Sequence, residues 1–270
     1  MEKKIKPKIL FLDILTDDPK IQQEIFDNVY EGKTYAEAMR KAAGCEESEW
    51  QTCNGPFETL PRNITDFSGI IIGGSLKNPV YRHEKPWMKK IYKFIRTASD
   101  KQIPILGICG GLQFTARAFG EEVVFNPKGR EMGTIQIKAT SVGVRDPLFF
   151  GLPVEFTAQS SHKCMIPKLR SGWKLLGSSM LCKTQAIAAG SSTRLLQFHP
   201  EMTAGQLRAL AMLRKKHLIS EGFLCDEKNF SKFMRSIKNT EKTGTKILRN
   251  FIEKFAIPHH NRSVENTRLT

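Results

Sequence analysis

Four short apolar runs, each followed closely by a glycine or another turn-forming residue, limit what this chain can fold into. They span Lys8 to Leu15, Ser68 to Ile72, Pro104 to Cys109 and Leu195 to Phe198. Patterns typical of amphipathic helices separate the first three runs and follow the third. Continuous apolar strands that alternate with helices form parallel sheets covered on both faces. The sequence therefore predicts an α/β fold, with three αβα layers around a mostly parallel, flavodoxin-like sheet.

The rest of the chain departs from this alternation. Residues 122–198 hold shorter strand patterns separated by prolines and glycines, which predicts a mixed, partly antiparallel extension of the sheet. Residues 31–60 are a possible insertion. We expect one domain over residues 1–222, followed over residues 223–270 by a helical C-terminal extension whose polar end frays.

Composition and charge argue against several classes of protein. The 270 residues contain no apolar run long enough to cross a bilayer, and the N-terminus does not resemble a signal peptide. Six cysteines without a C-x-x-C pair predict reduced thiols, no metal site and a cytoplasmic protein. The net charge of +15 comes from scattered basic residues, so nucleic acid is not an expected partner.

One cysteine stands in a pattern typical of a nucleophile. The stretch Gly107-Ile108-Cys109-Gly110-Gly111 has the form G-x-C-x-G at the junction of a predicted strand and a predicted helix. This is the nucleophile-elbow arrangement, in which small neighbours permit a tight, strained turn. For a lone cysteine, a small apolar residue at the end of a core strand would be the better interpretation, but the flanking glycines favour a nucleophile.

A thiolate at this position needs a second group beside it. A free cysteine thiol has a pKa of about 8.5, and lowering that value by roughly two units requires about 2.7 kcal/mol. The N-terminus of a helix supplies only about 0.3–1 kcal/mol. We therefore expect a histidine next to the sulfur, where it also serves as the base.

The candidate histidine follows the last apolar run. This run leads into His199-Pro200-Glu201. Pro200 ends the strand, which leaves His199 at the carboxyl edge of the sheet, where open α/β sheets carry their sites. Glu201 can reach back to the imidazole, fix its tautomer and support its positive charge, as the third member of a catalytic triad does.

A glycine pair lies one strand–helix unit before the elbow. Gly73-Gly74-Ser75 follows a predicted strand, and glycine lets backbone N–H groups approach a ligand closely. The N–H groups of Gly74 and Gly110 would then stabilise an oxyanion formed at the nucleophile. Since GGS is also a common loop sequence, this prediction depends on its position before the elbow.

Together, these motifs resemble those of the class I (triad) glutamine amidotransferases. GGS at 73–75, GICGGLQ at 107–113 and QFHPE at 197–201 stand in the family's order, and the resemblance covers about residues 8–220. It is closest to the amidotransferase domain of GMP synthetase, which residues 146–153 and 161–162 also resemble. The resemblance implies that the triad of Cys109, His199 and Glu201 cleaves the side-chain amide of glutamine through a glutamyl thioester, without a cofactor.

The resemblance also implies which residues hold the substrate. Gln113 matches the family residue at the amino-acid end of glutamine, and residues 129–133 resemble a segment whose backbone holds it. The expected substrate-binding residues are Gly73, Ser75, Gln113, Glu131, Met132, Gly133, Ser161 and His162.

Departures from the family pattern leave the substrate and the partner open. Gly110 and Leu112 stand where the family often has a bulkier residue and a histidine, and Lys163-Cys164 replace an acidic pair. The sequence shows no phosphate-binding loop for ATP. The chain is then a glutaminase that delivers ammonia to a separate ATP-dependent synthetase, or a free-standing γ-glutamyl hydrolase. A third hypothesis is a binding or regulatory protein without turnover.

Overall fold

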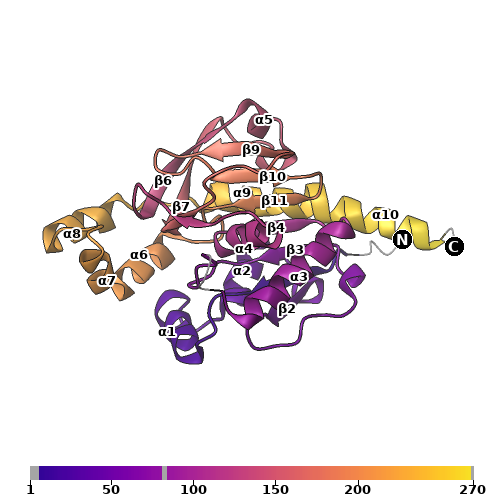
Figure 1. Ribbon diagram of the computed structural model, residues 1–270, viewed down its shortest axis with the longest axis horizontal. Coiled ribbons are helices and arrows are strands. Elements are labelled where there is room, and N and C mark those ends of the chain that lie inside the picture. Colours follow the sequence, from indigo (N-terminus) through magenta and orange to yellow (C-terminus); the bar gives the residue numbers. More distant parts are fainter. Residues whose placement is uncertain (1–5, 81–83, 269–270) are drawn as a thin grey trace.

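A large mixed sheet organises the protein, whose computed structural model describes residues 6–80 and 84–268 (Figure 1). Within these residues the sheet has nine strands, in the order β2-β1-β3-β4-β11-β10-β9-β6-β7. The strands are β1 (Ile9–Asp13), β2 (Trp50–Asn54), β3 (Gly69–Ile72), β4 (Ile105–Ile108), β6 (Glu131–Ala139), β7 (Glu155–His162), β9 (Trp173–Ser178), β10 (Ala186–Ala189) and β11 (Thr193–Leu196). A separate two-stranded ribbon pairs β5 (Val124–Phe125) with β8 (Cys164–Met165).

The direction of strand pairing changes at β11. Strands β2, β1, β3, β4 and β11 are all parallel, so their carboxyl ends lie at one edge. From β11 onward, β10, β9, β6 and β7 pair antiparallel. This confirms the predicted parallel core with a mixed extension. The carboxyl ends of β3, β4 and β11 are neighbours, which brings the three motifs found in the sequence together.

Helices cover both faces of the parallel half. On one face lie α3 (Pro86–Asp100) and α4 (Gly110–Ala118), and on the other lie α1 (Pro19–Val29), α2 (Tyr35–Ala43), α6 (Ala204–Leu213) and α9 (Glu241–Phe251). The antiparallel half is contacted by α5 (Ser141–Val144) and α8 (Glu227–Ser236). The remaining helices of the described residues are α7 (Lys215–Ser220) and α10 (Ile257–Arg268). Short helical turns span Glu47–Glu49, Ile64–Asp66, Pro147–Phe149 and Ile252–Ala256, the last of which is a π turn that joins α9 to α10.

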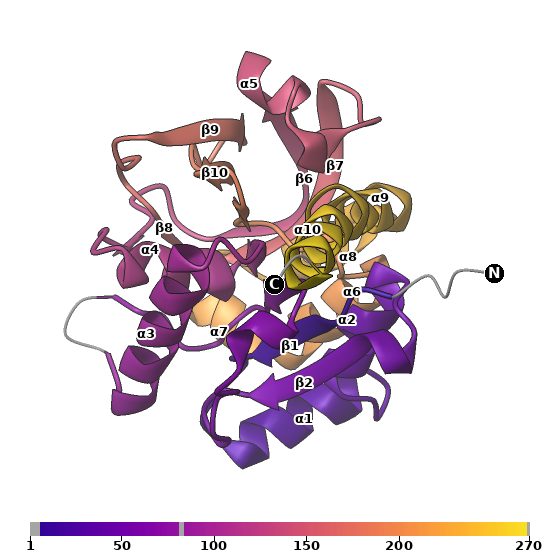
Figure 2. The same cartoon turned by 90° about the vertical axis from the view of Figure 1, so that its right-hand side faces the viewer.

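Alternate side chains of β1 show how the layers pack. Leu10 and Leu12 point into a cluster with α3 and α4, whereas Ile9 and Phe11 point into a cluster with α1, α2, α6 and α9. The pleat of a strand places successive side chains on opposite faces, so β1 is apolar from Ile9 to Leu12 because both of its faces are covered. The three αβα layers predicted from the sequence are confirmed (Figure 2).

Two segments of unclear role in the sequence belong to these layers. Residues 31–60, the possible insertion, supply α2 and the edge strand β2, which pairs with β1. In the C-terminal segment, Phe251 and Ala256 pack against Gly69 at the start of β3. The end of the chain, expected to fray, is helical as far as Arg268, where the described residues stop.

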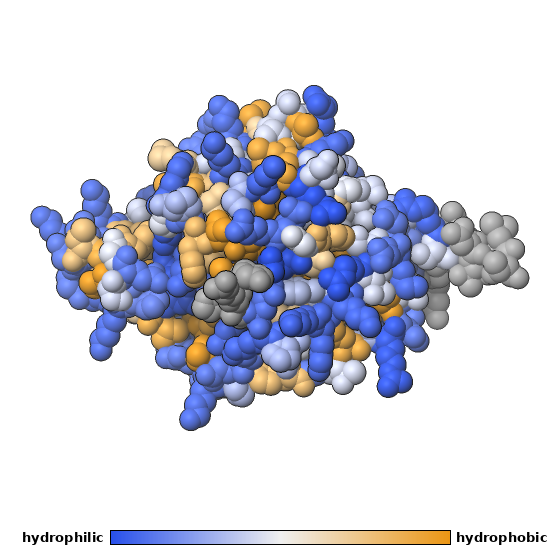
Figure 3. Space-filling view, in the orientation of Figure 1, coloured by the Kyte–Doolittle hydropathy of each residue, from blue (hydrophilic) through white to orange (hydrophobic). Residues whose placement is uncertain are grey.

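Hydrophilic residues cover most of the face shown in Figure 3, and apolar residues on it lie in small patches. Among residues 6–80 and 84–268, none of the helices is both long enough and apolar enough to cross a membrane.

Candidate active site

Cys109 forms a strained turn between β4 and α4. Its backbone has φ 50° and ψ −97°, a conformation with positive φ that residues with a side chain rarely adopt. Such strain costs about 1–3 kcal/mol and persists only where the surroundings enforce it. Here the Cys109 N–H donates to the Leu196 carbonyl of β11 at 2.7 Å, and α4 begins at Gly110. The geometry matches the elbow predicted from G-x-C-x-G.

The glycines after Cys109 allow two loops to touch. A β-carbon at Gly110 would lie 2.5 Å from Ser75, and one at Gly111 would lie 2.3 Å from the Ile72 carbonyl oxygen. Real β-carbons do not approach so closely, so larger residues would force the elbow away from the loop after β3. The Gly111 N–H also donates to the Gly73 carbonyl at 3.0 Å.

His199 and Glu201 form a buried pair beside the elbow. The Nδ1 atom of His199 lies 2.7 Å from Oε1 of Glu201, and the His199 N–H donates to the Gln159 carbonyl of β7 at 2.8 Å. Burial opposes a charge on the imidazole, but the Glu201 carboxylate and the Cys109 sulfur outweigh it and raise the pKa of His199 to about 10. His199 and Cys109 line one small cavity, and because Glu201 engages Nδ1, Nε2 is the ring nitrogen left for the sulfur.

Tyr35 is a site residue that the sequence analysis missed. It begins α2, and its hydroxyl donates to Oε1 of Glu201 at 2.9 Å. The same hydroxyl accepts a hydrogen bond from the Gly74 N–H at 2.9 Å. Tyr35 is 1% exposed, and burial raises the pKa of its hydroxyl far above the ordinary value, so it remains a proton donor. It therefore joins the carboxylate of the triad to the loop after β3.

The tyrosine changes which backbone donors are free for an oxyanion. In this conformation the Gly74 N–H, one of the two predicted donors, is engaged by Tyr35. The neighbouring Ser75 packs against Gly110 and lines the space around Cys109, and among the described residues its N–H has no hydrogen-bond partner. The assignment of Gly74 and Gly110 to an oxyanion site remains a prediction, with Ser75 as a further donor.

A chain of amides lies beside the sulfur. The Gln197 side chain donates to Sγ of Cys109 at 3.6 Å, and its Oε1 accepts from Nε2 of Gln113 at 3.3 Å. The role of Gln113 at the amino-acid end of a substrate remains a prediction from the resemblance. Gln197 was not singled out in the sequence, although it stands two residues before His199 in the QFHPE motif.

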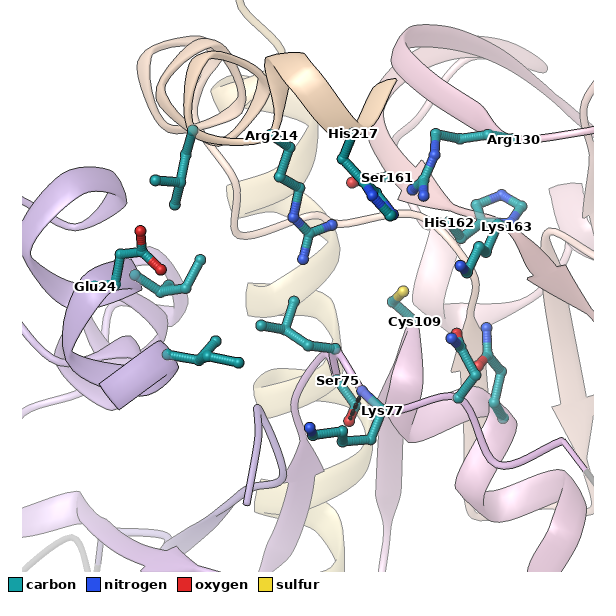
Figure 4. A pocket seen from close by; sticks show the side chains of 16 residues that line it. Glu24, Ser75, Lys77, Cys109, Arg130, Ser161, His162, Lys163, Arg214 and His217 are labelled. Carbon is teal, nitrogen blue, oxygen red and sulfur yellow. Dashed lines mark hydrogen bonds between the residues drawn. The ribbon is translucent and has the colours of Figure 1, made fainter. Parts of the chain in front are cut away.

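An open cleft of about 550 Å³ lies over Cys109 (Figure 4). Four of the eight expected substrate-binding residues line it. These are Ser75, Gln113, Ser161 and His162. The other four, Gly73, Glu131, Met132 and Gly133, are not part of its lining.

Packing explains why two of these residues do not face the cleft. Gly73 is covered by the rings of Tyr35 and Phe11, since a β-carbon there would lie 2.7 Å and 2.9 Å from them. The Glu131 carboxylate points into a buried network, where it accepts from the Ser179 hydroxyl at 2.7 Å and lies 3.1 Å from Nε2 of His162. That network holds the His162 ring at the cleft wall, so Glu131 supports a lining residue without itself reaching the cavity.

The cleft is rich in basic side chains. Arg130 and Lys163 both pair with Glu221, at 2.6 Å and 3.3 Å, and Lys77 pairs with Asp17 at 3.2 Å. Figure 4 shows these basic side chains on several sides of the nucleophile.

Arg214 is a further cation in the same cleft. It follows α6, and it has no ion-pair partner within residues 6–80 and 84–268. In Figure 4 its guanidinium group points toward Cys109. The sequence analysis did not single out Arg214, since a sequence does not tell which side of a helix turns to a cavity.

The four buried cysteines away from the cleft have raised pKa values, which make their thiols poor nucleophiles. Burial raises the pKa of Cys45 and Cys164 to about 12, and that of Cys53 and Cys182 to about 11. These four groups therefore stay protonated at neutral pH, and only the thiolate form of a cysteine is a strong nucleophile.

Comparisons with known proteins give the family that the sequence motifs resemble. The family model described as glutamine amidotransferase class-I matches residues 29–217. A protein of Schizosaccharomyces pombe described as glutamine amidotransferase-like is 28% identical over 186 residues, which are 64% of this chain and 72% of that protein. One of the subunits of the glutamine-hydrolysing GMP synthase of Methanocaldococcus jannaschii is 32% identical over 149 residues, which are 54% of this chain and 71% of that protein.

Solved structures share the fold. The crystal structure of a glutamine amidotransferase from Thermotoga maritima superposes on 93% of this chain and 99% of its own, with a TM-score of 0.72 and 19% identity. At that identity the likeness supports the fold alone, whereas the family model covers most of the sequence. The chain thus belongs to the class I glutamine amidotransferase family.

Proposed function

We propose that this protein hydrolyses the side-chain amide of a γ-glutamyl compound through a thioester on Cys109. The observation that carries the proposal is the contact of a strained, cleft-lining cysteine with a buried His199–Glu201 pair. Membership of the class I family supports the same chemistry. Of the alternatives, a binding protein without turnover gives no reason to hold Cys109 in a costly backbone conformation beside an imidazolium.

The proposed reaction begins with attack on the amide carbon. The Cys109 sulfur, as a thiolate stabilised by protonated His199, forms a bond to the γ-carbon, and negative charge develops on the carbonyl oxygen. Nε2 of His199 then gives its proton to the departing nitrogen, so that the C–N bond breaks and a neutral amine or ammonia leaves. Glu201 stabilises the imidazolium and keeps the ring in the required orientation.

The second half of the reaction restores the enzyme. Neutral His199 removes a proton from a water molecule, which attacks the thioester carbon and releases glutamate and the Cys109 thiolate. Backbone N–H groups of Gly110 and of Gly74 or Ser75 would stabilise the oxyanion in both halves, an effect worth about 3–4 kcal/mol per donor in related chemistry. For Gly74 to take part, its N–H must leave the Tyr35 hydroxyl.

The smallest substrate of this kind is glutamine, in which case the product ammonia would pass to a separate ATP-dependent synthetase. One relative is a GMP synthase subunit, which supports that arrangement. The size of the cleft favours a second candidate, a free-standing hydrolase of larger γ-glutamyl compounds, because cavities of about 300–1,000 Å³ typically hold ligands larger than an amino acid. In both cases a free thiolate needs reducing surroundings, for which we propose the cytoplasm.

A diazo-ketone analogue of glutamine tests the chemistry directly. We expect a covalent adduct on Cys109 by peptide mass spectrometry, together with release of glutamate from glutamine or a γ-glutamyl peptide. Cys109→Ala should remove the adduct and lower turnover by at least about a thousandfold, with thermal stability nearly unchanged. The matched control is Cys225→Ala, since Cys225 is the exposed free cysteine within the described residues. Turnover that survives Cys109→Ala would disprove the proposal.

A further inference from the structure

Arg214 lies in the proposed site without a counterion. It sits between α6 and α7 and lines the cleft together with Cys109. The neighbouring cations have carboxylate partners, namely Glu221 for Arg130 and Lys163 and Asp17 for Lys77, but no described acidic group pairs with Arg214. Burial, followed by the charge of Arg130, lowers the pKa of Arg214, which nevertheless remains charged at neutral pH. A partly buried charge without a counterion loses some of its hydration, so an anion that binds beside it is favoured.

Arg214 lies on the side of Cys109 where one half of a γ-glutamyl substrate would extend. In Figure 4, Arg130 and Lys163 lie to one side of Cys109, and Arg214 and Glu24 lie to the other. Attack by the sulfur divides a substrate into a glutamyl half and an amine half, which extend in different directions from the reacting carbon. Arg214 lines a small cavity together with Cys109 and His199, the residue that protonates the departing amine. Gln113, the residue expected at the amino-acid end of the glutamyl half, is not part of that lining, so the amine half extends toward Arg214.

The surroundings of Arg214 indicate what the amine half contains. Ile25 of α1, Leu76 and Leu213 line the same part of the cleft, and they offer apolar contact. The acidic side chain on this wall, Glu24, is exposed. A single guanidinium group above apolar walls suits a planar carboxylate, which it can bind through two parallel hydrogen bonds. A phosphate group, by comparison, would be expected to draw several unpaired cations.

We propose that the amine half of the substrate carries a carboxylate that pairs with Arg214, so that the protein acts on γ-glutamyl amino acids or short γ-glutamyl peptides. The inference rests on the proposed thioester chemistry and specifies its substrate class. The amide bond breaks as the thioester forms, and His199 protonates the departing amine. The carboxylate at Arg214 takes no part in the bond changes and leaves with the amino acid or peptide.

A pair of substrates that differ only in this carboxylate tests the inference. They are γ-glutamyl-alanine and γ-glutamyl-alaninamide, which share the glutamyl half. We expect the wild-type protein to prefer the free acid by about 10- to 100-fold in kcat/KM, the range for a hydrogen bond between charged groups. In Arg214→Gln that preference should fall close to one. Lys216→Gln, which alters an exposed lysine two residues away, should keep the wild-type preference.

The other results of this experiment would contradict either the role of Arg214 or the proposed function. Equal kcat/KM values of the wild-type protein for the two substrates would overturn the role of Arg214 and leave the proposed amide hydrolysis intact. If Arg214→Gln slows both substrates equally, Arg214 acts on the glutamyl half or on the fold, and the inference is wrong. If the wild-type protein cleaves neither substrate nor glutamine and forms no diazo-ketone adduct, the proposed function itself fails.

Discussion

Tyr35 links two parts of the site that come from distant segments of the chain. Its hydroxyl donates to Glu201 and accepts from the Gly74 N–H, both at 2.9 Å, and it is buried against Phe11 and Tyr30. A hydroxyl in this position can hold the carboxylate toward His199 while it occupies a backbone donor near the nucleophile. Tyr35 is not part of the lining of the 550 Å³ cleft, although it lines a small cavity with Cys109 and His199. We interpret it as a positioning residue, because its hydroxyl bonds Glu201 and the Gly74 N–H and not the sulfur.

Replacement of Tyr35 by phenylalanine tests this role. The variant removes one donor from a buried carboxylate, and a net loss of about 1–3 kcal/mol is typical for such a bond. We expect kcat to fall about tenfold or more while KM for the γ-glutamyl substrate changes little. The control is Tyr30→Phe, since Tyr30 stacks on Tyr35 at a centroid distance of 5.4 Å without touching Glu201 by a hydrogen bond. Unchanged kcat in Tyr35→Phe would contradict the role.

A second buried residue, Asp13, should make the stability of the protein depend on pH. Asp13 ends β1, is 3% exposed, and accepts a hydrogen bond from the Leu15 N–H at 2.8 Å. Burial above all, offset in part by that N–H and reinforced by Glu58, raises the pKa of Asp13 to about 6. Because the folded state holds the proton more tightly than the unfolded state, its stability contribution is present below about pH 3.8 and is lost as the pH rises through about 6.

Asp13→Asn should therefore stabilise the protein at alkaline pH. Asparagine keeps an oxygen for the Leu15 N–H and never becomes charged. A pKa difference of about two units corresponds to about 3 kcal/mol. In urea unfolding at pH 8 we expect the variant to exceed the wild type by up to that amount, with a smaller difference at pH 5. A gain that is the same at both pH values would show that Asp13 is not the titrating group.

At the scale of single residues, sequence motifs predicted the catalytic triad but not Tyr35 and Arg214. Cys109, His199 and Glu201 each stand beside residues that fix their local backbone, such as Gly110 and Pro200, so the sequence alone indicates their geometry. Tyr35 and Arg214 have no such local signature. Their importance comes from contacts between segments that the fold brings together, and an isolated tyrosine or arginine in a helical pattern gives no sign of them.

At the scale of elements, α9 is the helix that packs on the loop of the triad. A β-carbon added at Gly244 would lie 1.8 Å from the carbonyl oxygen of Pro200, between His199 and Glu201. The Asn250 side chain, one and a half turns later, donates to the carbonyls of Leu148 and Phe150 at 2.8 Å and 2.9 Å. The first contact holds the start of α9 against the turn of the triad, and the second holds its end against the helical turn at Pro147–Phe149.

Gly244→Ala should disturb this packing. Backbone atoms of a proline-containing turn cannot move aside easily, and forced overpacking usually costs about 1–3 kcal/mol. We expect a lower thermal midpoint together with reduced kcat, because the displaced turn carries His199 and Glu201. Gly205→Ala in α6 is the matched control. Its β-carbon would meet only the Thr203 hydroxyl at 3.7 Å, so alanine in that helix should be neutral or stabilising. Similar losses in both variants would refute the specific contact.

The strands were more predictable than the packing of the helices. β1, β3 and β4 were recognisable because a strand covered on both faces is apolar throughout and ends at a glycine or a turn. The amphipathic pattern of residues 223–270 likewise predicted helices with one buried face. It did not indicate what that face covers, since the partner surface is formed by β3 and by the turn at Pro200, which lie far away in sequence.

At the scale of the whole molecule, the C-terminal helices contribute to the same core as the sheet. Residues from α8 to the π turn that are at most 7% exposed include six large apolar side chains: Phe230, Ile237, Ile247, Leu248, Phe251 and Phe255. They share one continuous cluster with Ile9, Phe11 and Ile71 of the parallel strands. We therefore propose that residues 1–222 and 223–270 form one folding unit, although the sequence suggested a domain and an extension.

Removal of residues 223–270 should abolish cooperative folding. Full burial of a large apolar side chain stabilises by about 1.5–3 kcal/mol, so six of them contribute roughly 9 kcal/mol or more, comparable with the total stability of about 5–15 kcal/mol for a typical protein. We expect residues 1–222 to give a broad, non-cooperative urea transition and to form no adduct with the diazo-ketone. Adding residues 223–270 as a separate chain should restore both properties in part. A truncated protein that unfolds cooperatively at the wild-type urea midpoint would contradict this prediction. The C-terminal helices would then not be needed for folding, and their contact with the Pro200 turn would not be needed for the site.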